Sequence, residues 1–378
     1  MVEGLPSVAD ARDLVALVLQ NLAQRIPDVG IVVDDQNSPA RASVRHVSIM
    51  WGRRTALSNG LDDHTMLGLM RRSWMALAAA TALVGVPRVH AEIRPTGPLD
   101  TAALIATHYR VEPNIVYLSV GGWNGKLDLY VPRRPDGPMP IAILFHGGGW
   151  VTGTKDEIAL DVLPYLVMGF AVANVDYRLA RVATAPAAVQ DSRCALRWVI
   201  RHATQYGLDV EHLVLVGSSA GAHLALMAAL APASAGFDGL CPGDEPLRVA
   251  AVINFFGVID VAELLGPANP RDFAIGWMGG GPERAALARR VSPITYVGKG
   301  SPPIFTAHGE ADPVVPFEQA KRLHEALTHA GVANRLFPLR RTGHGDFDGA
   351  AVLSVNRALR DFLVKQGIVN PGGSELLH

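Results

Sequence analysis

The most informative stretch of this sequence for its fold is His212-Leu213-Val214-Leu215-Val216-Gly217-Ser218-Ser219-Ala220-Gly221. Its apolar first half predicts a buried strand, and a helical pattern over residues 219–230 follows the turn at once. The turn itself reads Gly-x-Ser-x-Gly, which in a strand–turn–helix context lifts a serine to the exposed end of a sheet. Because the glycines flank Ser219 symmetrically and leave room for neighbouring backbone, we predict that Ser219, and not Ser218, is a nucleophile.

A second glycine-rich turn follows the apolar run 141–145. It reads His146-Gly147-Gly148-Gly149-Trp150. Glycines let backbone N–H groups approach a developing negative charge without interference from side chains. We therefore predict an oxyanion hole formed by the backbone N–H groups of Gly148, Gly149 and Ala220, the last directly following the nucleophile.

A serine nucleophile needs a general base, and the base needs an orienting acid. His344 lies in a glycine-flanked loop before the last helical pattern and is the predicted base. Asp312 follows the apolar run 303–307, at the same sheet edge as Ser219, and is the predicted acid. Asp346 is only two residues from His344, and Glu310 lies nearer to the strand end, so both are weaker candidates than Asp312.

Strand and helix patterns alternate along the rest of the chain. Two strands joined by a Gly/Asn turn are expected at 116–120 and 127–131, and further strands at 141–145, 170–175, 213–216, 249–255 and 303–307. Helical patterns occupy 187–203, 219–230, 317–330 and 350–364. This alternation predicts an α/β fold with a mostly parallel central sheet and helices on both faces. The long connection 257–300 is expected to be a small lid insert.

Composition excludes several classes of protein. Hydrophobic residues make up 49% of the 378 residues, too many for a disordered chain, and the net charge of −1 gives no basic excess for nucleic acid. No phosphate-cradling loop is present, so we expect no cofactor. His324 and His329 are five residues apart, whereas a zinc helix needs four, and we expect no metal.

Other polar residues are interpreted as structural. His146, His223 and His308 are expected to brace loops or pack in the core. Cys194 and Cys241 lie in unrelated segments. They either form one bridge or stay apart, and both readings remain open.

The first ninety residues have the pattern of a leader. The apolar run 74–86 is too short for a stable membrane span, which needs about 20 residues, but it fits the core of a signal peptide. Arg71 and Arg72 precede it, and Val89-His90-Ala91 follows as a cleavage site. We expect a signal peptide over 66–91, a secreted or periplasmic protein, and a catalytic domain over 92–378. The alternative is a retained core helix in a cytoplasmic protein. Two explanations remain for residues 1–65 of the 1–91 leader. Either the start codon was assigned too far upstream, or these residues are a genuine N-terminal extension.

Together these motifs resemble the α/β-hydrolase superfamily. The resemblance is greatest to bacterial esterases and lipases related to hormone-sensitive lipase and to small feruloyl-esterase-like carboxylesterases. It covers about residues 113–366 and includes Asp176-Tyr177-Arg178-Leu179, Ser292-Pro293-Ile294 and the motifs quoted above. It implies a serine carboxylesterase for a small-molecule ester, of short-chain or aryl (feruloyl) type, with an acyl-enzyme on Ser219.

The same triad also serves other reactions. An amidase, an arylformamidase-like enzyme or a peptidase-like hydrolase would use the same residues, and the segment 257–300 would decide among them. A hydrolase-fold binding protein without catalysis is a further alternative, against which the intact Ser219, Asp312 and His344 argue.

Overall fold

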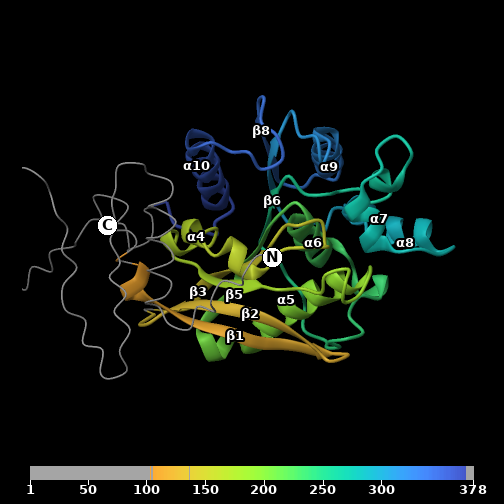
Figure 1. Cartoon of the computed structure of the whole chain (residues 1–378). Coiled ribbons are helices and arrows are strands. Elements are labelled where there is room, and N and C mark those ends of the chain that lie inside the picture. Colours follow the sequence, from red (N-terminus) through yellow and green to blue (C-terminus); the bar gives the residue numbers. More distant parts are fainter. Residues whose placement is uncertain (1–102, 104, 136, 372–378) are drawn as a thin grey trace, which may run out of the picture. The chain divides into compact units, whose positions relative to one another are not determined.

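An eight-stranded sheet forms the centre of the described part of the chain, which in this computed structural model is residues 103, 105–135 and 137–371 (Figure 1). The order across the sheet is β1-β2-β4-β3-β5-β6-β7-β8. β1 pairs antiparallel with β2, and β2 with β4, while every other pair is parallel. The strands are β1 (Tyr109–Val120), β2 (Trp123–Pro132), β3 (Met139–Phe145), β4 (Ala171–Val175), β5 (Leu208–Ser218), β6 (Ala251–Phe255), β7 (Ile304–Gly309) and β8 (Asn334–Leu339).

Helices cover both faces of this sheet. They are α4 (Leu163–Val167), α5 (Ala187–Tyr206), α6 (Ala220–Leu230), α7 (Asp272–Met278), α8 (Arg284–Arg290), α9 (Phe317–His329) and α10 (Gly349–Lys365), with short 3-10 turns at Lys155–Ile158, Ala233–Ala235, Glu263–Leu265 and Pro293–Tyr296. α4 and α10 cover one face, and α5 and α6 cover the other (Figure 1). The predicted α/β class, with its mostly parallel sheet, is confirmed.

Alternation along the central strands explains the two cores. Ile141 and Ile143 of β3 belong to the core that contains α5 and α6, whereas Ala142 and Leu144 belong to the core that contains α4 and α10. Successive side chains of a strand point to opposite faces, so a strand buried on both faces must be apolar throughout. The continuous apolar runs in the sequence follow from this.

The sheet contains one strand that the sequence patterns did not predict. β8 is an additional strand at the sheet edge; its sequence Asn-Arg-Leu-Phe-Pro-Leu contains a proline and two polar residues. An edge strand tolerates Pro338 because one side of its backbone has no strand to bond. The segment 257–300 contains two short helices, α7 and α8, each of seven residues.

The leader expected at 1–91, including the signal peptide at 66–91, lies outside the described residues. Within the described part, no helix has both the length and the apolar character that a membrane crossing requires.

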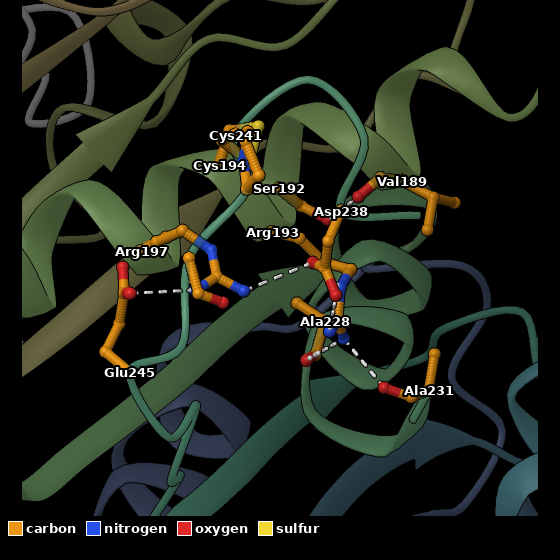
Figure 2. Close-up of polar contacts among 12 residues, drawn as sticks. Val189, Ser192, Arg193, Cys194, Arg197, Ala228, Ala231, Asp238, Cys241 and Glu245 are labelled. Carbon is orange, nitrogen blue, oxygen red and sulfur yellow. Dashed lines mark hydrogen bonds and ion pairs between the residues drawn. A yellow bond between two sulfur atoms is a disulfide. The ribbon is translucent and has the colours of Figure 1, made fainter. Parts of the chain in front are cut away.

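Cys194 and Cys241 form a disulfide, which resolves the question that the sequence left open. The bond ties α5 to the loop that connects α6 with β6 (Figure 2). Beside it, the buried Arg193 makes a bidentate pair with Asp238, with two N···O distances of 2.7 Å. Arg193 also donates to the carbonyl oxygens that end α6, those of Ala228 and Ala231 (Figure 2). The same arginine therefore joins α5, α6 and the loop.

Arg197 extends this contact by one helical turn. Its guanidinium lies 3.1 Å from Glu245 and 3.6 Å from Asp238 (Figure 2). Arg201 also pairs with Glu245, so three arginines surround two carboxylates beside the disulfide.

Removal of the disulfide tests how much this loop contributes to stability. We expect the double variant Cys194→Ala, Cys241→Ala to lose about 2–4 kcal/mol of unfolding free energy, because the unfolded chain gains freedom. Urea denaturation measures the loss. A reducing agent should lower the stability of the wild type and leave the double variant unchanged. Equal stability of the oxidised wild type and the double variant would contradict this account.

Candidate active site

Ser219 stands at the sharp turn between β5 and α6. Its backbone has φ +53° and ψ −118°, a conformation that a residue with a side chain adopts only when its surroundings enforce it. Its N–H donates to the Phe255 carbonyl oxygen at 2.8 Å. A Cβ at Gly217 would lie 2.3 Å from the Gly221 carbonyl carbon, and a Cβ at Gly221 would lie 2.0 Å from the Phe145 oxygen. Both glycines are therefore required by contact between backbones.

The three residues predicted as a triad come together at one sheet edge. The His344 Nε2 lies 2.8 Å from the Ser219 Oγ, and the His344 Nδ1 lies 2.7 Å from an Asp312 carboxylate oxygen. An ionised carboxylate only accepts, so Nδ1 carries the proton and Nε2 is left free to accept from the serine hydroxyl. This arrangement has the geometry of a nucleophile, its base and an orienting acid.

Asp312 is buried, accepts three hydrogen bonds and has a fourth nitrogen close by. Its Oδ1 accepts from the N–H groups of Val314 and Val315 at 2.8 and 2.9 Å, its Oδ2 accepts from His344, and the Nε2 of His308 lies 3.2 Å from Oδ2. Burial raises the pKa of this carboxyl, but the contacts with His308, His344 and the two backbone groups outweigh burial and hold the pKa well below its ordinary value. Asp312 therefore stays ionised beside His344.

His308 is a functional neighbour that the sequence did not reveal. Its interpretation as a strand-end structural residue accounts for the hydrogen bond of its Nε2 with the Val315 carbonyl oxygen at 3.0 Å, but misses the 3.2 Å approach of the same nitrogen to the Asp312 carboxylate. A sequence signal was present in the pattern His308-x-x-x-Asp312. A spacing of four residues lets the loop after the strand fold back, so that the aspartate lies near the histidine at the strand end.

The two alternative acids do not take part in the hydrogen bonds that join Asp312, His344 and Ser219. Glu310 and Asp346 are exposed, and among the described residues neither carboxylate bonds to His344. The Asp346 carboxylate lies beside the Gly343 backbone instead, where a Cβ on that glycine would meet it at 2.5 Å.

The predicted oxyanion loop lies against the nucleophile. From the Gly147 backbone, a Cβ would be 3.6 Å from the Ser219 Cβ. Gly148 and Gly149 have φ of +102° and +58°, and in the described structure their N–H groups donate to no protein acceptor. Ala220 is the first residue of α6, where a helix N–H has no partner within the helix. The N–H groups of all three residues are thus free of protein acceptors in the described structure.

His146 and Tyr177 brace the start of this loop. Burial lowers the pKa of His146 to about 4, so the ring is neutral, and its Nδ1 lies 2.7 Å from the Gly147 carbonyl oxygen. The ring stacks on Tyr177 at 4.2 Å, and the Tyr177 hydroxyl donates to the His146 carbonyl oxygen at 2.8 Å. The Asp-Tyr-Arg-Leu motif therefore supports the loop from the neighbouring strand β4.

The segment 257–300 contacts the other end of the loop. Phe273 of α7 lies against Gly149, where a Cβ would meet its ring at 2.9 Å, and Trp277 of α7 stacks on Trp150 at 4.2 Å. Trp150 is fully buried. The expected lid insert thus packs directly on the predicted oxyanion loop.

Among the described residues, no group of three or more His, Cys, Asp or Glu side chains is arranged to hold a metal ion. His324 instead bonds through Nδ1 to Asn334 at 2.8 Å.

The variant Asp312→Asn tests the orienting acid. An amide N–H facing His344 stabilises the wrong tautomer, so we expect kcat for a p-nitrophenyl ester to fall by roughly 10⁴-fold with little change in KM. Steady-state kinetics measure the effect. Asp346→Asn and Glu310→Gln are the matched controls and should stay near the wild-type kcat. A larger loss in either control than in Asp312→Asn would show that the acid is misassigned.

Known proteins are similar to this chain in sequence and in fold. The BD-FAE family model matches residues 127–327, which is more than half of the chain, and a model described as TAP-like protein matches residues 285–374. Esterase LipQ of Mycobacterium tuberculosis is 32% identical over 71% of this chain and 66% of its own length. The probable carboxylic ester hydrolase LipM of the same organism is 32% identical over 61% of this chain and 54% of its own length. The chain thus spans between about half and two thirds of these relatives.

Solved structures agree with the sequence relatives. The thermophilic esterase Est2 of Thermogutta terrifontis superposes with a TM-score of 0.60 at 28% identity, over 70% of this chain and 95% of that one. A truncated carbohydrate esterase from gut microbiota gives a TM-score of 0.57 at 27% identity, over 69% of this chain and 97% of that one. The resemblance expected from the motifs is confirmed, and this chain belongs to the BD-FAE family of the α/β-hydrolase esterases.

Proposed function

We propose that this protein is a serine carboxylic-ester hydrolase that forms an acyl-enzyme on Ser219. The observation that carries the proposal is the continuous chain of hydrogen bonds from Asp312 through His344 to the Ser219 hydroxyl. A hydroxyl bonded to a free imidazole nitrogen loses its proton as it attacks, and the ionised acid stabilises the imidazolium that results.

The reaction proceeds in two halves. The Ser219 Oγ attacks the ester carbonyl carbon while His344 Nε2 takes the hydroxyl proton, and the tetrahedral intermediate collapses as His344 returns that proton to the departing alcohol. Water then attacks the acyl-enzyme, again with His344 as base, and the carboxylic acid leaves. No proton is transferred to Asp312 at any step.

The oxyanion of each intermediate is held by backbone N–H groups. We assign this role to Gly148, Gly149 and Ala220, because their N–H groups have no acceptor in the described structure, Ala220 directly follows Ser219, and the two glycines follow Gly147, which lies against Ser219. Loss of one such donor typically costs about 100–1,000-fold in rate.

The substrate class that fits best is a short-chain or aryl ester. Phe273 lies against Gly149 of the predicted oxyanion loop, and Phe256 lies edge-on to the base His344 at 4.7 Å. We infer that these rings provide apolar surface for the acyl and alcohol groups of the substrate. Solved structures of the Thermogutta esterase carry propionate and butyrate, and others of the same protein are phosphorylated by paraoxon, which supports the proposed acyl size and the serine chemistry here.

A substrate series tests the activity and its nucleophile. We expect p-nitrophenyl esters to be hydrolysed, with kcat/KM highest for short acyl chains and aryl acids, and Ser219→Ala to lower kcat by about 10⁵–10⁶-fold. Ser218→Ala is the matched control and should retain turnover far above that of Ser219→Ala. An aryl amide assayed in parallel distinguishes the amidase reading. Hydrolysis of the amide but not the esters, or ester turnover that survives Ser219→Ala, would overturn the proposal.

We also propose that the protein is exported and cleaved after Ala91. The Cys194–Cys241 disulfide supports this, since such bonds persist mainly in oxidising compartments.

N-terminal sequencing of the protein from the periplasm or medium tests the export proposal. The mature chain should begin at Glu92. A Leu77→Arg variant, which places a charge within the apolar run, should remain uncleaved inside the cell. A chain that stays intracellular and keeps residues 66–91 in the wild type would refute the proposal.

A further inference from the structure

His223 lies one helical turn after Ser219 in α6 and is fully buried. Both of its ring nitrogens are bonded. Its Nδ1 accepts from the Trp150 indole Nε1 at 3.2 Å, and its Nε2 lies 2.6 Å from the Val291 carbonyl oxygen. The role expected from sequence, packing in the core, leaves both hydrogen bonds unexplained.

The two partners fix the protonation of the ring. An indole N–H only donates and a carbonyl oxygen only accepts, so the proton must be on Nε2 and Nδ1 must be bare. Burial lowers the pKa of His223 to about 4, while the bond to Val291 acts in the opposite direction. The ring is therefore neutral near pH 7, and its unprotonated Nδ1 can accept the hydrogen bond from Trp150.

These bonds connect three separate segments. Trp150 ends the glycine loop, with φ of +61°, and Val291 directly follows α8 in the segment 257–300. Trp277 of α7 stacks on Trp150, and the His223 ring contacts both tryptophans edge-on, at 4.9 and 5.4 Å. The nucleophile helix, the glycine loop and the insert thus meet at one histidine.

We propose that His223 is a positioning residue that holds the oxyanion loop in place relative to Ser219 through its hydrogen bond with Trp150. The inference rests on the proposed esterase function and adds a residue that does not itself touch the reacting atoms. Its physical basis is rigidity, because the His223 N–H donates at 3.1 Å to the carbonyl oxygen of Ser219, the residue that caps the start of α6. The bond therefore fixes Trp150, the residue that follows Gly149, relative to α6.

The effect should appear in the transition state more than in substrate binding. Oxyanion donors act only when they lie about 2.7–3.1 Å from the developing charge, and a displacement of about 1 Å can cost roughly 100-fold in rate. Loss of the Trp150 bond should therefore lower kcat while KM changes little.

Two substitutions separate the bonds of the ring. An asparagine side chain reaches the position of Nδ1 and can still accept from Trp150, whereas a glutamine reaches the position of Nε2 and can still donate to Val291. We expect His223→Gln to lower kcat for a p-nitrophenyl ester by about 10–100-fold with KM within about threefold, and His223→Asn to lose clearly less. Affinity for a trifluoromethyl ketone, whose adduct with Ser219 carries an oxyanion, should fall in parallel with kcat.

A double-mutant cycle with Trp150→Phe tests whether the two residues act together. In the wild type, Trp150→Phe should lower kcat about as much as His223→Gln does, and in the His223→Gln variant it should add little. His324→Asn, which removes another buried histidine away from the site, is the control for a general loss of stability. It should lower the melting temperature without lowering kcat.

The outcomes distinguish the two proposals. Absence of ester turnover that depends on Ser219 defeats the proposed function itself. If that turnover is present, additive losses in the cycle, a change confined to KM, or an equal loss in His223→Asn and His223→Gln would overturn the role of His223. Melting curves identify any variant that does not fold. If His223→Gln does not fold, Trp150→Phe is compared with His223→Asn instead. Only Trp150→Phe removes the hydrogen bond, so the proposal requires it to have the lower kcat.

Discussion

The structure depends on one close contact between backbones, where Gly221 lies against the carbonyl oxygens of Phe145 and His146. A methyl group would not fit there, at 2.0 and 2.4 Å from those oxygens. This contact brings the end of β3 beside the turn that follows β5. It places the glycine loop next to Ser219 and the N-terminus of α6 next to both. Ser219 stands at this turn with a positive φ, between Gly217 and Gly221, whose backbones are both in close contact with neighbouring backbone.

The parallel sheet supplies the remaining geometry. Strands β3, β5 and β7 all end at the same edge, so the loops that follow them carry the oxyanion loop, the nucleophile and the acid to one place. His344 follows β8 and reaches the same edge. Sequence reasoning predicts this convergence because it needs only strand direction and chain order. The fold and the meeting of the three side chains were therefore accessible from motifs at residues 146–150, 217–221, 312 and 344.

Features that depend on tertiary contact were not accessible in this way. β8 is hidden by Pro338 and by polar residues that an edge strand tolerates. The pairing of Cys194 with Cys241 requires α5 and a distant loop to be neighbours, which no local pattern encodes. The bond between His223 and Trp150 likewise joins segments that only the folded chain brings together. His308 is four residues from Asp312, but the spacing alone does not show that its ring turns toward the carboxylate.

Activation of Ser219 by His344 and Asp312 can be measured by peptide mapping with mass spectrometry after reaction of the full chain with paraoxon, with the rate of labelling followed over time. We expect one phosphoryl adduct per chain, located on Ser219, formed much more slowly in His344→Ala and in Asp312→Asn. An adduct on Ser218 or elsewhere, or a labelling rate that is unchanged by His344→Ala, would contradict this expectation.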